Sequence, residues 1–263
     1  RAMARLARSN RAELSSSIAA APPPPRAARD DRAVVSVVVP TLSAYIDPAH
    51  WDARAKSLGG TSNSLLAGFA SRLGVRMGRM LPDGTVTLSF PVGQRTVDDT
   101  RGNAMTFAFI TVDPARAATD LGEIRGKLKE RLTELVHNAF ELLEPIPLAS
   151  LTPKWLARRL VGAGLGSAGL PIGCSNLGEL DPAANRPDGT DADYAYGRLI
   201  EPGISKDTLE RIGGQLFVAS GRVPGHFFIT VVAYRAGAEN SQDVLREMVS
   251  RTFDEFGLTA EIM

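Results

Sequence analysis

Phe90-Pro91-Val92-Gly93-Gln94-Arg95, followed by Arg101-Gly102-Asn103 and the apolar run from Ala104 to Val112, is the stretch that decides how this chain folds. Its first part is typical of a strand that ends by placing Arg95 in a polar loop. The Gly-Asn pair then opens a second strand, in which β-branched and aromatic residues are frequent. Most other features of the chain can be interpreted as elements that meet this loop.

Apolar periodicity on both sides of this loop predicts helices and strands in alternation. Asp47 and Thr61 are typical N-caps, and each precedes a predicted helix. Helices are expected at residues 48–57, 62–73, 121–143 and 241–256, with another beginning at Pro153. Strands are expected at residues 34–40, 77–81, 85–91, 104–112, 171–180, 194–200, 215–220 and 226–234. Two strand pairs look antiparallel, so the sequence predicts an α/β fold whose mixed sheet is covered by helices.

Residues 1–32 differ in composition from the rest of the chain. They combine an Ala- and Arg-rich segment, the polyproline run Pro22–Pro25 and a charged stretch. This is typical of a linker or tail, and a crossover from an upstream domain is the alternative. Residues 33–263 are expected to form one lobe. The chain begins at Arg1 without the apolar core of a signal peptide, which suggests a fragment or a processed product.

The charge balance and the single cysteine exclude several classes of protein. Thirty Lys and Arg residues face 29 Asp and Glu residues, a formal net charge of +1. A nucleic-acid partner normally requires a basic excess, so none is expected. Cys174 alone cannot form an internal disulfide, which favours a reducing compartment. No run approaches the roughly 20 apolar residues of a membrane span. We expect a cytoplasmic protein, with peripheral contact to a membrane or lipid surface as the alternative.

The three histidines do not form a convincing catalytic motif. His50, His137 and His226 are far apart in the sequence, no HExxH motif is present, and one cysteine cannot complete a zinc site, so no metal is expected. A GxSxG nucleophile elbow is also absent. Cys174 lies in an apolar strand, where a thiol is usually inert. The sequence therefore predicts no catalytic residue in this chain.

Three polar segments lie at the ends of apolar elements, where sheet proteins tend to place function. They are residues 60–67, the loop that contains Arg95, and Ser175-Asn176-Leu177-Gly178. Each segment also has a structural interpretation. Thr61 can cap a helix, Arg95 can be a buried ion-pair partner, and Ser175 and Asn176 can satisfy backbone groups at a bulge.

Together and in this order, these segments resemble the C-terminal half of the chloramphenicol acetyltransferase-like superfamily. The most similar branches are the wax ester synthase/diacylglycerol acyltransferases, the polyketide-associated acyltransferases and the condensation domains of peptide synthetases. The family's G-x-T-x-N-D-like motif corresponds to residues 59–64, where Ser64 replaces the acidic residue. Its P-V-S-x-R strand end and following G-N correspond to residues 91–95 and 102–103, and its late S-N-x-G corresponds to residues 175–178. The resemblance covers residues 34–256.

The resemblance implies one lobe of a two-lobed fold with a substrate tunnel between the lobes. Thr61, Asn63, Ser175 and Asn176 would border that tunnel and bind substrate. The backbone N–H groups at the helix start would favour an anionic ligand. Because the family's lobes bury an apolar face against one another, this lobe is expected to expose one.

Two further residues would support the site structurally. Arg95 and Asn103 would brace the loop, with the aspartate of the missing motif as a further partner for Arg95. The family's general base is the second histidine of HHxxxDG, in the N-terminal lobe. This chain has no His-His pair. The resemblance therefore implies a partner lobe that carries HHxxxDG, in the same precursor or as a second chain.

The resemblance implies an O-acyltransferase lobe whose co-substrate is acyl-CoA or an acyl-carrier thioester, with no covalently bound cofactor. Its acceptor would be an alcohol of lipid or polyketide type. Two alternatives remain open. The first is an inactive family member that binds an acyl chain or a partner protein, which the replacement at Ser64 favours. The second is a fragment of a peptide-synthetase condensation domain, which forms amide bonds.

Overall fold

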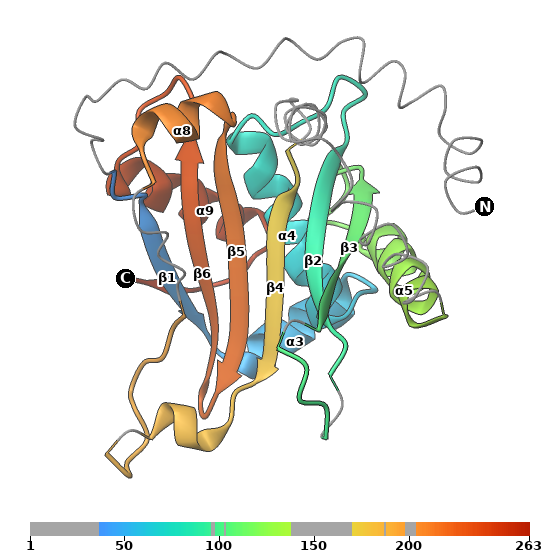
Figure 1. Cartoon of the computed structure of the whole chain (residues 1–263), viewed down its shortest axis with the longest axis vertical. Coiled ribbons are helices and arrows are strands. Elements are labelled where there is room, and N and C mark those ends of the chain that lie inside the picture. Colours follow the sequence, from blue (N-terminus) through green and yellow to red (C-terminus); the bar gives the residue numbers. More distant parts are fainter. Residues whose placement is uncertain (1–36, 96–97, 103, 138–169, 187, 198–203) are drawn as a thin grey trace.

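The computed structural model describes residues 37–95, 98–102, 104–137, 170–186, 188–197 and 204–263 (Figure 1). Its helices are α3 (Pro48–Ser57), α4 (Ser62–Arg76), α5 (Gly122–His137), the 3₁₀-helix η1 (Pro182–Asn185), α8 (Lys206–Arg211) and α9 (Gln242–Glu255). Its strands are β1 (Thr41–Ile46), β2 (Val86–Gly93), β3 (Met105–Val112), β4 (Ile172–Glu179), β5 (Gly214–Val223), β6 (His226–Arg235) and β7 (Glu261–Ile262). The expected linker at residues 1–32 and the helix expected from Pro153 lie outside the described residues.

The seven described strands form one mixed sheet in the order β3-β2-β4-β5-β6-β1-β7. β4 pairs in parallel with both β2 and β5, while β2–β3, β5–β6, β1–β6 and β1–β7 are antiparallel. The stretch that opens the sequence thus becomes the β2–β3 hairpin, with Phe90 opposite Ala108. The predicted mixed sheet is confirmed.

Helices α3, α4 and α9 cover one face of the sheet, and α5 lies beside β3 (Figure 1). α4 contributes much of the core, since Leu65, Phe69 and Leu73 are fully buried on it. The Phe69 ring packs 4.6 Å from that of Phe253 on α9, and Trp51 on α3 stacks 4.3 Å from Phe227 on β6. Large aromatic contacts of this kind account for much of the apolar area that folding removes from water.

A second, smaller hydrophobic cluster lies on the opposite face of the sheet, over strands β1, β5 and β6. Tyr45, Val223 and Phe228 are buried there beneath partly buried Leu180 and Ala195. The loop after β4 is thereby held against the sheet, and its Tyr194 packs edge-on against Tyr45 at 4.8 Å.

Three predicted strands are wrong. Residues 37–40 of the expected strand 34–40 are not in a strand, and the sheet begins at Thr41 because residues 41–46 pair with β6. Residues 77–81 are irregular because Met77 ends α4 and Gly78 has a φ of 72°. Residues 194–197 form a loop, in which the Tyr194 hydroxyl donates to Glu261. The turn-rich region before β5 contains the unpredicted helix α8.

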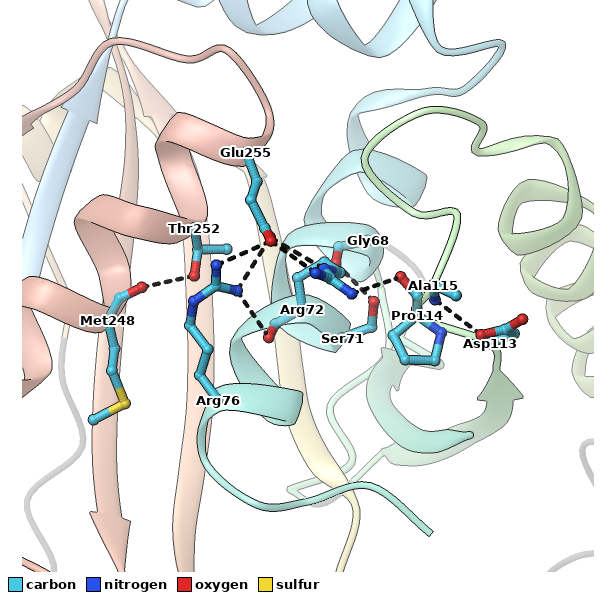
Figure 2. A network of polar contacts seen from close by, with 10 residues as sticks. All are labelled: Gly68, Ser71, Arg72, Arg76, Asp113, Pro114, Ala115, Met248, Thr252 and Glu255. Atoms are coloured by element: carbon cyan, nitrogen blue, oxygen red, sulfur yellow. Dashed lines mark hydrogen bonds and ion pairs between the residues drawn. The ribbon is translucent and has the colours of Figure 1, made fainter. Parts of the chain in front are cut away.

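An ion-pair network joins α4 to α9 (Figure 2). The Glu255 carboxylate accepts hydrogen bonds from Arg72 at 2.7 Å and from Arg76 at 3.1 Å. Arg72 also donates to the carbonyl oxygen of Pro114, in the segment after β3. Since about a quarter of each of the three side chains is exposed, water screens the pairs only in part. The pKa of the Glu255 carboxyl is lowered to about 2, first by the hydrogen bond from Arg72 and then by that from Arg76.

Among the described residues, no helix combines the length and the apolar character that a bilayer crossing requires.

Candidate functional site

The N-terminus of α4 begins with a reciprocal capping arrangement. The Thr61 hydroxyl accepts from the Ser64 N–H, and the Ser64 hydroxyl accepts from the Thr61 N–H at 2.6 Å. Ser64 is fully buried. Its side chain therefore accepts the hydrogen bond from the N-cap N–H that a Glu or Gln side chain usually accepts in a capping box. The G-x-T-x-N-D-like motif that residues 59–64 resemble ends in an acidic residue. At that position this chain has the buried hydroxyl of Ser64, which caps the helix.

Substitution of this cap gives a first prediction. Ser64→Ala should lower the free energy of unfolding by about 1 kcal/mol, because it leaves the Thr61 N–H without its acceptor. Ser57→Ala, which removes an exposed hydroxyl from the last turn of α3, should change it by less than about 0.5 kcal/mol. Urea unfolding of both variants measures the difference. Equal effects would show that the Ser64 hydroxyl does not cap α4.

Asn63 and Asn176 meet at this end of the sheet. Asn176 lies near the carboxyl end of β4, and its amide group donates to the side-chain oxygen of Asn63 on the first turn of α4. The Asn176 oxygen in turn accepts from the Gly178 N–H at 2.9 Å, where a φ of 68° requires glycine. Two predicted substrate-binding residues, 113 positions apart in the sequence, thus form one exposed polar pair.

Ser175 is not part of this pair. Successive side chains of a strand point to opposite faces of the sheet, so Ser175 faces away from α4 while Asn176 faces towards it. Ser175 is half-buried and lies opposite Ala219 of β5. The structure thus groups Thr61, Asn63 and Asn176 on one face and places Ser175 on the other.

Arg95 lies in the loop after β2, which projects from the same end of the sheet as the carboxyl end of β4 (Figure 1). Its guanidinium donates to the carbonyl oxygen of Gly102 across the loop. It is exposed, so the buried ion pair considered from the sequence does not form with any described residue. Asn103 lies outside the described residues.

A second arginine also stabilises this loop. Arg101 forms an ion pair with Asp99 at 2.5 Å and donates to the carbonyl oxygen of Gln94. The hydrogen bonds from Arg101 lower the pKa of the Asp99 carboxyl to about 2. The loop therefore carries an ionised carboxylate at all physiological pH values, and that carboxylate is already paired.

Sequence reasoning missed a cluster of charged residues beside the asparagine pair. Arg222 on β5 contacts Asp52 on α3 at 2.5 Å and Glu179 on β4 at 3.6 Å, and it lies 5.3 Å from the centre of the Phe227 ring. Strand register brings Glu179 and Arg222 together across β4 and β5, and the packing of α3 on the sheet adds Asp52. No local motif in the sequence could have indicated this.

Ser220 is a further missed polar residue. It lies opposite Asn176 in the register of β4 and β5, it is fully buried, and its hydroxyl has no hydrogen-bond partner among the described residues. An unpaired buried hydroxyl is unfavourable and rare in native proteins, and a functional role is one of the reasons for which it is retained. It places an available donor and acceptor beneath the Asn63–Asn176 pair.

The described histidine and cysteine side chains lie apart from the asparagine pair. His50 and His226 are the two described histidine side chains, and His226 packs against Tyr45 and Tyr194. Within the described ranges, no group of three His, Cys, Asp or Glu residues could hold a metal ion. Burial raises the pKa of the Cys174 thiol, which keeps it protonated and unreactive.

Comparison with known proteins shows similarity at the level of fold. No protein-family model matches the chain. No curated protein matches it either. Among solved structures, the chain is similar to the nonribosomal peptide synthetase FmoA3 in its AMPPNP-bound form, with 21% sequence identity and a TM-score of 0.52 over 83% of this chain and 22% of that one. It is also similar to F. sporotrichioides TRI101 complexed with coenzyme A and T-2, with 13% identity and a TM-score of 0.51 over 88% of this chain and 53% of that one.

The chain therefore has the fold of one part of a larger architecture. It spans about a fifth of FmoA3 and about half of TRI101. Its mixed sheet with helices corresponds to about half of the two-lobed chloramphenicol acetyltransferase-like fold, as predicted. At these identities the similarity establishes fold alone.

Proposed function

We propose that this chain is the C-terminal lobe of a thioester-dependent O-acyltransferase, and that its Asn63–Asn176 pair borders the acyl-transfer tunnel. The observation that carries the proposal is the meeting of these two asparagines at the sheet end, in a fold that matches half of a protein whose structure contains coenzyme A. The acceptor would be an alcohol, of lipid type, and the donor an acyl-CoA or acyl-carrier thioester. The general base would come from an N-terminal lobe with HHxxxDG.

An exposed apolar surface supports the need for a partner lobe. Met105, Phe107 and Phe109 project from the same face of the edge strand β3, and each is about half exposed. The two phenylalanine rings lie 6.3 Å apart. Neighbouring exposed aromatic residues at a sheet edge favour burial against another polypeptide surface.

In the proposed reaction, the acceptor hydroxyl attacks the thioester carbonyl carbon. The C–S bond breaks, the ester C–O bond forms, and the proton passes from the hydroxyl through the partner lobe's base to the departing thiolate. Asn63 and Asn176 would position the reactants with their amide groups. Effective positioning of two reactants accounts for a large share of catalysis in reactions of this kind.

The test combines this chain with an N-terminal lobe that carries HHxxxDG and measures thiol release from acyl-CoA in the presence of a long-chain alcohol. Asn63→Ala and Asn176→Ala should each reduce transfer about tenfold, equivalent to about 1.4 kcal/mol of transition-state stabilisation. Their free energies of unfolding should fall by no more than about 1 kcal/mol, because the pair is exposed. Gln242→Ala is the control, since its exposed amide binds Thr41 near the opposite end of the sheet.

The results separate the three interpretations. Loss of transfer in both asparagine variants but not in the Gln242 variant supports the acyltransferase. Acyl-CoA binding without any thiol release, even with the partner lobe, would instead support an inactive binding protein. The replacement of the family's acidic residue by Ser64 is the sequence feature that favours that alternative. Amide formation from carrier-bound thioesters with an amine acceptor would support the condensation-domain fragment.

A further inference from the structure

An arginine-lined pocket lies at the end of the sheet opposite the asparagine pair, where α4 and β6 end and α9 crosses them. Its volume is about 260 Å³, and it is lined by Arg76, Arg235, Val244, Glu247, Met248 and Arg251. A water molecule occupies about 30 Å³ in the liquid, so the pocket has room for a compact polyatomic anion with its hydration. The lining contains three cations and one carboxylate.

Two of the three arginines already have a carboxylate partner. Arg76 pairs with Glu255 at 3.0 Å and Arg251 with Glu247 at 2.5 Å. Arg235 has no ion-pair partner in the described part of the chain. Its Nη1 donates to the carbonyl oxygen of Arg76 at 3.5 Å, and its buried Nε has no acceptor among the described residues. Arg235 is therefore the charge in this pocket that lacks a counterion.

A fourth arginine, Arg79, lies in the irregular segment between α4 and β2. Arg79 is only 6% exposed, and its buried Nη2 has no acceptor among the described residues. This nitrogen lies 3.2 Å from the place that a Cβ on Gly214 would occupy, and Gly214 is the register partner of Arg235. Burial lowers the pKa of Arg79. Two guanidinium groups with unsatisfied N–H donors thus lie at one end of the β5–β6 pair.

A buried or half-buried guanidinium without an anion is strongly unfavourable, because desolvation is not offset by any pairing. The planar guanidinium presents paired N–H donors that match the oxygens of a phosphate group. We propose that this pocket binds a compact oxyanion of the phosphate class on Arg235, with Arg76 and Arg251 at its rim and Arg79 adding positive potential from behind. The anion is either free phosphate or the phosphate group of a small molecule.

Binding of sodium phosphate to the purified chain tests the proposal, by ³¹P NMR titration and isothermal calorimetry at about 0.15 M ionic strength kept constant with chloride. We expect saturable binding and a rise in Tm of about 2–4 °C at saturation. Arg235→Gln should weaken phosphate binding at least tenfold. Arg116→Gln removes a highly exposed arginine that pairs with Asp120 outside the pocket, and it should bind as the unaltered chain does.

Arg79→Met keeps the test informative if Arg235→Gln disturbs folding. It removes an unpaired buried charge, so the Tm in phosphate-free buffer should not fall, while the phosphate-dependent rise should shrink. Phosphate also stabilises proteins non-specifically. An equal rise in the unaltered chain and in Arg235→Gln, or binding that does not saturate, would overturn the proposal. Tighter binding of glycerol phosphate than of inorganic phosphate would assign the site to a phosphorylated small molecule, and equal binding to the free anion.

Discussion

Gly214→Ala should destabilise this protein by about 3–5 kcal/mol, a loss comparable to much of the stability of a typical domain. Gly214 opens β5 with a φ of 93°, a backbone conformation that costs an L-residue about 1–2 kcal/mol. A Cβ there would also lie 2.3 Å from the carbonyl oxygen of Tyr234 and 3.1 Å from the Ala236 N–H nitrogen. Because both atoms belong to the backbone at the end of β6 and just after it, that backbone must move.

Gly225→Ala is the matched control. Gly225 lies in the turn between β5 and β6 with a φ of 81°, but a Cβ there would meet no atom within 4 Å. This variant carries only the conformational strain and should lose about 1–2 kcal/mol. Chemical denaturation of both variants separates strain from collision. Equal losses would show that the β5–β6 pair adjusts to the added methyl group without difficulty.

The sequence predicts the elements of this fold wherever local pattern and tertiary role agree. The sequence predicts Asp47 and Thr61 as N-caps, and both side chains accept the hydrogen bonds that a cap requires. The strands at residues 104–112 and 226–234 appear within one or two residues of their predicted bounds as β3 and β6. In each case side-chain preference, period and burial favour the same structure.

The wrong predictions come from segments whose local preference differs from their place in the sheet. Val38 belongs to a β-branched run but is 89% exposed, whereas the less strand-like Ser43 and Ala44 are buried between β6 and β7. Whether a segment forms a strand depends on which neighbouring strands it can pair with. The local residue preferences of the segment do not specify that pairing. Residues 194–197 of the predicted strand 194–200 form a loop instead, and the Tyr194 ring packs that loop against Tyr45.

The same limit applies to the site. Asn63 and Asn176 were predicted singly and by resemblance, and the structure joins them. Strand alternation alone already implies that Ser175 faces away from Asn176. Arg222 and Ser220 could not be predicted as neighbours of the pair, because their proximity depends on the parallel register of β4 with β5.

The two ends of the sheet differ in chemistry, and α4 connects them. The N-terminus of α4 carries Asn63, which is hydrogen-bonded to the exposed amide group of Asn176. The C-terminal part of α4 carries Arg72 and Arg76, which bind α9 through ion pairs with Glu255. A variant that weakens the α4–α9 junction should therefore lower stability without altering the groups at the asparagine pair. Because of this separation, the contribution of the ion-pair network to the free energy of unfolding can be measured without disturbing the asparagine pair.

Glu255→Gln should lower the free energy of unfolding at pH 7 by about 2–3 kcal/mol. The substitution leaves Arg72 and Arg76, both about three-quarters buried, without their shared carboxylate. In a fully buried pair the loss would be larger, and the exposed quarter of each side chain reduces it. Glu247→Gln is the control: it breaks a highly exposed pair with Arg251 on the same helix and should change stability by less than about 0.5 kcal/mol.

The stability difference between the unaltered chain and Glu255→Gln should also depend on pH, and this dependence tests the role of the carboxylate charge. The pKa of Glu255 lies below its ordinary value of 4.5, at about 2, so the folded state prefers the ionised carboxylate. Its contribution is therefore complete above about pH 4.5 and is lost as the pH falls towards 2. The stability gap between the unaltered chain and Glu255→Gln should narrow over that window, while the gap for Glu247→Gln should stay near zero. A Glu255 gap that stays constant from pH 7 to pH 3 would mean that the carboxylate charge does not hold α4 to α9.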